Sequence, residues 1–299
     1  MRPSPYAAIA IAIVAVSFAS IFIRWSESAP LVIAAYRLIF ATLIVLPFAL
    51  AQQRKELRGL ASRDLIFMVG VGGILAAHFG LWMTSLKVQG VTVASSVVLV
   101  TSHPILVGVV SHLVLRERVN AITSAGIAIG LAGVALIGVG DYGLSSSTFG
   151  GDLLALGGGV MAGLYILAGR HFRQRISLLT YVLIVYASAA ILLAVAAFAS
   201  DGMRPSGDLW RELGIFLVMA LVSQIGGHTL YNWALKYVTA PVVSVSLVGE
   251  PIGASILAWL LLSEVPTNLV AIGSLAAVFG IYLTARGQSR IAQMKRAAA

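Results

Sequence analysis

HPILVGVVSHLVLRE at residues 103–117 and EPIGASILAWLLLSE at residues 250–264 share one pattern and begin 147 residues apart. In both stretches an ionisable residue precedes a proline, and a Leu-x-Glu sequence ends the apolar run. The same offset places Gly126 and Gly133 on Gly273 and Gly280. A period of about half the chain indicates a duplicated sequence.

Apolar segments fill almost the whole chain on both sides of these stretches. Hydrophobic residues make up 59% of the sequence, charged residues 10%, and the mean hydropathy is +0.97. A soluble domain of this length would need a charged shell that this composition does not supply, and a transmembrane helix needs about 20 mainly apolar residues. The sequence therefore predicts an all-α integral membrane protein with ten transmembrane helices, at residues 6–23, 31–50, 65–86, 91–115, 121–140, 153–169, 178–199, 213–235, 241–262 and 267–285.

The two halves are expected to have opposite orientations in the membrane. Each half holds five predicted spans, an odd number, so the second half must enter from the opposite side. We expect a first five-helix repeat at residues 1–144 and a second, inverted repeat at residues 145–299. Inverted repeats are typical of secondary transporters, because two near-equivalent packings open one central site to opposite sides.

The net charge of +9 is unevenly distributed between the two sides. If the loops are counted from the N-terminus, 15 of the 20 Lys and Arg residues lie on the N-terminal side and 4 on the other, and Arg37 lies within a span. This positive-inside pattern predicts that both termini are cytoplasmic. It also favours the lipid bilayer, and not nucleic acid, as the partner of this basic chain. The absence of cysteine excludes disulfides and thiolate metal sites.

The duplicated motif carries a family resemblance. The patterns Pro104…Leu115-x-Glu117…Gly126 and Pro251…Leu262-x-Glu264…Gly273 resemble the drug/metabolite transporter superfamily, EamA type, over essentially the whole chain. More narrowly, the chain resembles the bacterial aromatic amino acid exporters of that superfamily. The resemblance implies a transporter of the bacterial plasma (inner) membrane that exports aromatic and other neutral amino acids through a central cavity lined by both halves. His103 departs from the family, in which a small or apolar residue often precedes the proline.

Aromatic and polar side chains recur at helical spacing within the predicted spans, and such side chains in lipid usually face a cavity or a partner. His78 and Trp82 lie at i and i+4 in the third span, and Gln224, His228 and Tyr231 lie at i, i+4 and i+7 in the eighth. An aromatic cavity with few hydrogen-bonding groups suits a zwitterion with a flat apolar side chain. We expect these stripes to form the substrate site with Ser17, Phe18, Met161, Tyr165, Ser244, Ser246 and Glu250. The alternative is that the aromatic rings fill space and the imidazoles bond to neighbouring helices.

Glu250 is the only carboxylate deep within a predicted span. Burial favours a neutral carboxyl group, so Glu250 is a candidate for proton exchange or for pairing with a substrate amine. An equal alternative is that it caps backbone groups freed by Pro251. We expect Pro104 and Pro251 to remove backbone hydrogen bonds mid-helix, to kink their spans and to act as hinges.

Three other charged residues have simpler expected roles. Arg37, about two turns inside its span, either attracts a carboxylate or extends its guanidinium to the membrane interface. Glu117 and Glu264 follow the fourth and ninth spans. We expect both to fix turns or to pair with nearby cations.

Two alternative functions and one alternative assembly stay open. A polyspecific drug or metabolite exporter would share the fold. A membrane enzyme acting on lipid would need a cluster of ionisable residues, whereas His78, His103 and His228 are scattered along the sequence. We therefore expect no enzymatic activity, no cofactor and no metal. Glycine pairs such as Gly126 and Gly130 predict close helix packing within a monomer, and a weak homodimer through the fifth and tenth spans is the alternative.

Overall fold

The computed structural model describes residues 4–105, 120–142, 145–200, 202–238, 243, 246–247 and 249–297, and every regular element in these ranges is a helix. Eight helices are long and apolar enough to cross a membrane, namely Pro5–Trp25, Pro30–Gln52, Ser62–Lys87, Ala121–Gly140, Ser146–Phe172, Leu178–Ser200, Leu209–Ala234 and Asn268–Gly287. Two shorter apolar helices, Val93–Ile105 and Gly249–Leu262, adjoin residues outside the described ranges. Eight of the ten predicted spans are thus present at nearly the predicted positions, and the other two are described only in part.

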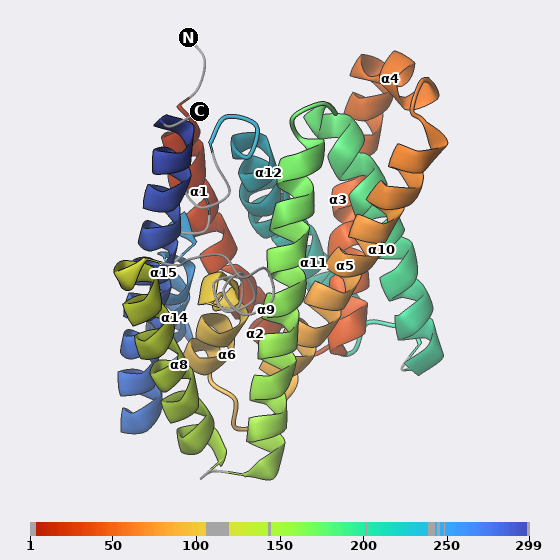
Figure 1. Ribbon diagram of the computed structural model, residues 1–299. Coiled ribbons are helices and arrows are strands. Elements are labelled where there is room, and N and C mark those ends of the chain that lie inside the picture. Colours follow the sequence, from red (N-terminus) through yellow and green to blue (C-terminus); the bar gives the residue numbers. More distant parts are fainter. Residues whose placement is uncertain are drawn as a thin grey trace.

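The helices follow in the order α1 (Pro5–Ser17), α2 (Ala19–Trp25), α3 (Pro30–Gln52), α4 (Arg54–Arg58), α5 (Ser62–Lys87), α6 (Val93–Val100), α8 (Ala121–Tyr142), α9 (Ser146–Phe172), α10 (Leu178–Ser200), α11 (Leu209–Met219), η1 (Ala220–Thr229), α12 (Leu230–Ala234), α14 (Gly249–Leu262) and α15 (Asn268–Ala297). The eighth predicted span is a composite, because the π-helix η1 joins α11 to α12. α1 begins and α15 ends on the same side of the molecule (Figure 1).

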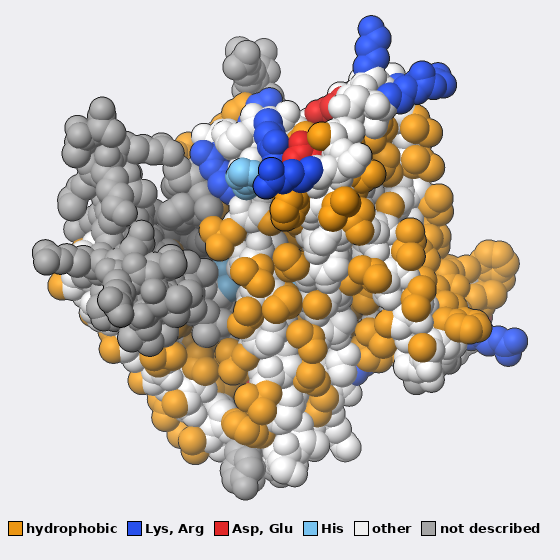
Figure 2. Space-filling view, turned by 45° about the vertical axis from the view of Figure 1, so that its right-hand side comes forward, with side chains coloured by type: hydrophobic (Ala, Val, Ile, Leu, Met, Phe, Trp, Pro, Cys, Tyr) orange, Lys and Arg blue, Asp and Glu red, His pale blue; other side chains and the backbone are white. Residues whose placement is uncertain are grey.

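The helices form one bundle with a pair of helices at one end (Figure 1). α8 and α15 lie side by side there, while α3, α5 and α10 pack together at the opposite end. On the face seen in Figure 2, apolar side chains spread down the side of the bundle, and Lys and Arg side chains gather along its upper rim. Other large apolar side chains are also exposed, among them Phe198 (77% exposed) and Leu275 (73%). Such a surface fits hydrocarbon, in which charged groups are costly.

Glycines allow α8 and α15 to pack backbone against backbone. A Cβ atom on Gly126 would lie 2.8 Å from the carbonyl oxygen of Gly280, and one on Gly133 would lie 2.6 Å from that of Gly273. Both distances are shorter than van der Waals contact, so larger residues would force the helices apart. This is the close packing within the chain that the glycine pattern predicts. Because Gly126 meets Gly280 and Gly133 meets Gly273, the two helices run antiparallel.

The prediction that both prolines kink continuous helices is wrong for the described residues. α6 ends at Val100, a turn follows, and helical geometry resumes at His103, so Pro104 lies at the start of the next helical segment. Pro251 lies in the first turn of α14, after a turn at Leu247. A proline in the first turn removes no intrahelical hydrogen bond, because the N–H groups there have no intrahelical acceptor. Each proline therefore follows a helix break.

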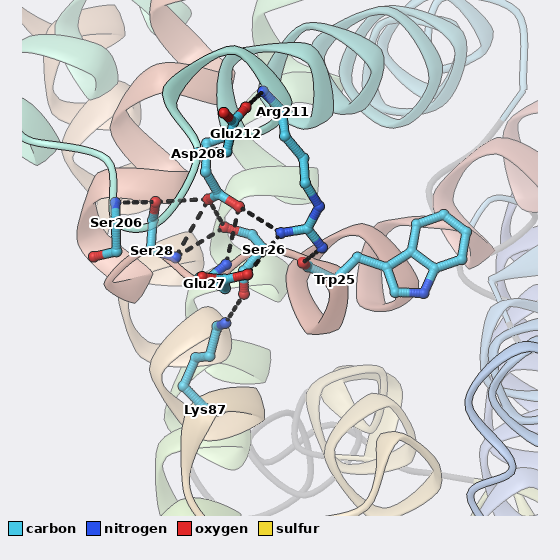
Figure 3. A network of polar contacts seen from close by, with 9 residues as sticks. All are labelled: Trp25, Ser26, Glu27, Ser28, Lys87, Ser206, Asp208, Arg211 and Glu212. Atoms are coloured by element: carbon cyan, nitrogen blue, oxygen red, sulfur yellow. Dashed lines mark hydrogen bonds and ion pairs between the residues drawn. The ribbon is translucent and has the colours of Figure 1, made fainter.

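A buried carboxylate joins the two halves on one face of the bundle (Figure 3). Glu212, in the first turn of α11, accepts hydrogen bonds from the hydroxyl groups of Ser26 at 2.5 Å and Ser28 at 2.6 Å. It also accepts the backbone N–H of Glu27 at 3.0 Å. These three residues form the loop before α3, and we call this group the Glu212 clasp. Further bonds around it come from Lys87, Ser206 and Arg211.

A second carboxylate joins the halves on the opposite face. Glu56, in α4, accepts the hydroxyl of Thr180 at 2.6 Å and the backbone N–H of Ser177 at 2.9 Å, at the start of α10. Beside it Arg175 pairs with Asp64 at 2.8 Å. We call this second group the Glu56 clasp. In both clasps, a carboxylate near the third helix of one half binds the loop between the first two helices of the other half. The two clasps together join the two halves of the chain.

Candidate substrate site

A cavity lies between the two halves. Residues in or next to α1, α5 and α6 line it from the first half, and residues in or next to α9, η1, α12 and α14 line it from the second. The lining residues are Val16, His78, Trp82, Val100, Thr101, His103, Ala162, Tyr165, Ile166, His228, Tyr231, Asn232, Leu235, Val243, Leu247 and Glu250. The space that the centre of a water molecule can occupy is about 60 Å³. This holds a few waters but is far below the ~300 Å³ of the smaller ligand pockets. A ligand as large as an amino acid therefore requires the wall to move outward.

Two histidines face each other from the two halves. The ring centroids of His78 and His228 lie 6.2 Å apart. The Nδ1 of His78 lies 2.9 Å from the carbonyl oxygen of Gly158, so Nδ1–H donates to that carbonyl. Trp82 stacks on His78 with centroids 6.1 Å apart and planes 10° from parallel. The histidines and Trp82 thus give the cavity a flat aromatic wall.

Several polar atoms of the wall have no hydrogen-bond partner among the described residues. They are the indole N–H of Trp82, the two ring nitrogens of His103, the hydroxyl of Tyr231 and the side-chain oxygen of Asn232. The Asn232 amide itself is fixed, since it donates to the Tyr165 hydroxyl at 2.7 Å and to the His228 carbonyl at 2.8 Å. Buried polar groups are seldom left without a partner. Both donors and acceptors are therefore available to a bound molecule.

Half of the predicted substrate-site residues line the cavity, and these are His78, Trp82, Tyr165, His228, Tyr231 and Glu250. Ser17 does not, because its hydroxyl donates to the Ile13 carbonyl at 2.8 Å and the side chain packs α1 against Gly253 of α14. Gln224 is turned away and binds Arg37. Phe18, Met161 and Ser246 are not part of the cavity wall, and Ser244 lies outside the described residues.

Sequence reasoning missed three polar residues of the wall, Thr101, His103 and Asn232. Asn232 lies four residues after His228, so the helical spacing that identified His228 could have found it. His103 lines the cavity together with Glu250, its counterpart in the repeat. The apolar wall residues carry no such signal, because lipid-facing residues have the same character.

The ionisable residues that are scattered along the sequence converge in space. His78, His103, His228 and Glu250 all line the one cavity, contrary to the expectation of isolated single residues. Within the described part of the chain, no three His, Asp or Glu side chains come close enough together to hold a metal ion.

Arg37 does not extend to the membrane interface, which removes that alternative. Its side chain is fully buried, with 0% exposure. The Nε–H donates to the Gln224 side-chain oxygen at 2.8 Å, and the guanidinium lies over the Phe79 ring, 4.2 Å from its centroid. Gln224 and His228 both lie in η1. Arg37 therefore binds the same helical segment that carries His228 of the cavity wall.

Glu264 has the structural role that the sequence predicts. It accepts the backbone N–H of Val93 at 2.5 Å, at the start of α6, and lies 3.8 Å from Arg24. The carboxylate therefore caps a helix of the other half. Glu117, its counterpart in the first half, lies outside the described residues.

Apolar helices around an aromatic cavity with a few free polar groups are typical of membrane proteins with a small-molecule site. The chain belongs to the EamA-like transporter family, whose sequence profile matches residues 4–139 and again residues 149–286. It is therefore a multi-pass membrane transporter.

Relatives agree with this assignment, and a solved structure shares the fold. The chain is 25% identical to the Uncharacterized transporter YoaV of Bacillus subtilis (strain 168), over 82% of this chain and 81% of that protein. It is 24% identical to an Uncharacterized transporter of Archaeoglobus fulgidus, over 86% of this chain and 89% of that protein. One crystal structure has a TM-score of 0.66 at 19% identity, covering 97% of this chain and 99% of that chain, and so shares the fold.

Proposed function

We propose that this protein is a secondary transporter that exports aromatic and other neutral amino acids by alternating access through the cavity between its halves. The observation that carries the proposal is the cavity wall. It combines stacked rings, which match a flat apolar side chain, with free donors and acceptors, which match the polar end of an amino acid.

The contacts between repeat-related residues support an inverted architecture with repeats at residues 1–144 and 145–299. The offset of the duplication carries Gly126 to Gly273 and Gly133 to Gly280. The contact between Gly126 and Gly280 therefore has a counterpart in the contact between Gly273 and Gly133, and both occur. Contacts exchanged in this way are expected from a two-fold axis between the halves, which is the basis of alternating access.

The charge distribution supports an orientation with both termini in the cytoplasm of a bacterial cell. The start of α1 and the end of α15 lie on the side that carries the rim of Lys and Arg side chains (Figures 1 and 2). Positive charge gathers on the cytoplasmic side of membrane proteins. A monomer in the bilayer is the favoured assembly, because the glycine faces of α8 and α15 are occupied by each other.

The experiment that tests this function is counterflow of labelled tryptophan into liposomes that contain the purified protein. We expect saturable exchange that unlabelled phenylalanine inhibits. Trp82→Ala removes one face of the cavity and should slow exchange about tenfold, which is the effect of 1.4 kcal/mol in binding. Trp210→Ala is the matched control, because Trp210 is 80% exposed and lies outside the cavity wall.

A polyspecific exporter of drugs or metabolites is the alternative, and it is favoured by the apolar remainder of the cavity wall. Cationic drugs added as competitors distinguish the two functions. Exchange of drugs without exchange of any amino acid would keep the transporter and reject the proposed substrate class.

A further inference from the structure

Arg37 is a buried cation that lacks an ion-pair partner within the described residues. Its side chain has 0% exposure, and neither Nη1 nor Nη2 has a hydrogen-bond partner in that part of the chain. Among the described residues, its side chain donates one hydrogen bond, from Nε–H to the neutral Gln224 side chain. Burying an unpaired charge costs several kcal/mol, and charged residues retained within a membrane usually have a role in function.

One aromatic ring separates this cation from the cavity. The guanidinium lies 4.2 Å above the centre of the Phe79 ring. The same ring lies 4.8 Å from the centroid of His78 and 5.2 Å from that of His228, and both histidines line the cavity. The positive charge is therefore held directly behind the wall that the two histidines form.

A carboxyl group is contributed by the other half of the chain. Glu250, at the start of α14, is the only carboxylate among the residues that line the cavity. No ion pair joins Arg37 and Glu250 in the described structure. In apolar surroundings charges act over several ångströms, because screening is weak.

We propose that Arg37 and Glu250 together select and orient a zwitterion, with the substrate carboxylate on the side of Arg37 and the substrate ammonium group on the side of Glu250. This inference rests on the proposed amino acid substrate and adds which groups recognise its two charges. A zwitterion supplies a partner of opposite sign to both residues at once. A ligand with only one of the two charges leaves the other protein charge unmatched in a site that excludes water.

Three ligands with the same indole ring test the inference. They are tryptophan, tryptamine, which lacks the carboxylate, and indole-3-propionate, which lacks the amine. The measurement is the half-saturating concentration for thermal stabilisation of the purified full-length protein. We expect the wild type to bind tryptophan about tenfold more tightly than either analogue, as an unmatched charge costs 1.4 kcal/mol or more.

The variants should separate the two charges. Arg37→Gln should bind tryptophan no better than tryptamine, while its preference over indole-3-propionate remains. Glu250→Gln should show the reverse pattern. Arg37→Lys keeps the charge and should keep the wild-type preference. Arg63→Gln is the matched control, because Arg63 also lies over a phenylalanine ring, Phe67 at 5.7 Å, but lies outside the cavity wall.

Each result has a definite meaning. A wild type that binds tryptamine as tightly as tryptophan overturns the inference even if no variant folds. Retention of the tryptophan preference in Arg37→Gln also overturns it and leaves the proposed amino acid transport intact. If the wild type binds none of the three ligands, the proposed substrate class and the inference both fall.

Discussion

The Glu56 and Glu212 carboxylates, at the two faces of the bundle, are stabilised in the same way. Each accepts hydrogen bonds from hydroxyl groups and from backbone N–H groups. Hydrogen bonds to a charged acceptor contribute about 1.5–3 kcal/mol each. For Glu56, which lies outside the membrane spans, burial alone would raise the pKa, but hydrogen bonds from Ser177 and Thr180 outweigh it. The pKa of Glu56 is therefore lowered from its ordinary value.

This lowered pKa predicts a defined pH dependence of stability. A carboxylate whose pKa is lower in the folded than in the unfolded protein stabilises the fold above its unfolded pKa of about 4.3, and this contribution is lost as the pH falls through the folded pKa. The wild-type protein should therefore have a higher melting temperature than Glu56→Gln at pH 7, and this difference in melting temperature should shrink below about pH 4.5.

The control for this experiment is Glu27→Gln. The Glu27 side chain is 61% exposed, and its pair with Arg211 lies at the surface, where such pairs contribute about 0–1 kcal/mol. The Glu27→Gln substitution should therefore change the melting temperature little at any pH. A difference between wild type and Glu56→Gln that stays constant from neutral to acid pH would show that the Glu56 hydrogen bonds do not stabilise the fold.

The polar residues of the cavity could be predicted from sequence in part, and the reason lies in helical spacing. His78 and Trp82 stand out because polar and aromatic side chains repeat along one face of an apolar helix. Ser17 has the same character but binds its own helix backbone, which spacing alone does not reveal. The burial of Arg37 also could not be predicted, because its partner Gln224 lies in the other half of the chain.

Pairs of helices show a different kind of constraint, in which the smallest residues decide the geometry. α8 and α15 approach so closely that their glycines meet the opposite backbone. Hydropathy predicts the helices, and the glycine pattern predicts a close approach, but neither identifies the partner helix. The break before Pro251 also could not be predicted, since a proline in the first turn and a proline in mid-helix look alike in sequence.

A methyl group at this helix pair should destabilise the protein. A Cβ on Gly280 would overlap the backbone of Gly130, so Gly280→Ala should lower the free energy of unfolding by about 1–3 kcal/mol. Gly70→Ala is the matched control in α5, because no atom lies within 4 Å of the added Cβ. There the greater helix propensity of Ala should be neutral or stabilise by about 0.5–1 kcal/mol. Equal melting temperatures for the two variants would contradict the close packing.

The helix breaks at the two prolines are candidate hinges. Because Pro251 lies in a first turn, Pro251→Ala restores an N–H that needs no intrahelical acceptor, so expression and melting should change little. If the breaks act as hinges, the transport rates of Pro104→Ala and Pro251→Ala should change. Unchanged kinetics in both variants would remove this role.

At the scale of the whole molecule, the two halves are held together by contacts that cross between them at both faces and at the cavity. The duplication, the apolar segments and the charge distribution predicted the helical membrane fold from sequence. The clasps around Glu56 and Glu212 could not be predicted, because each joins loops more than a hundred residues apart. The small volume of the cavity follows from side-chain packing and also lies beyond sequence patterns.

The central claim is that the cavity is a substrate site that opens in turn to both sides of the membrane. The chain contains no cysteine, so a single Ala162→Cys substitution in the cavity wall is a specific probe. Val195→Cys, on the lipid-facing surface of α10 with 63% exposure, is the control. In oriented proteoliposomes, a membrane-impermeant thiol reagent should modify Ala162→Cys from either side, tryptophan should slow both reactions, and Val195→Cys should not react. Modification of Ala162→Cys from one side only, whether or not tryptophan is present, would contradict the account.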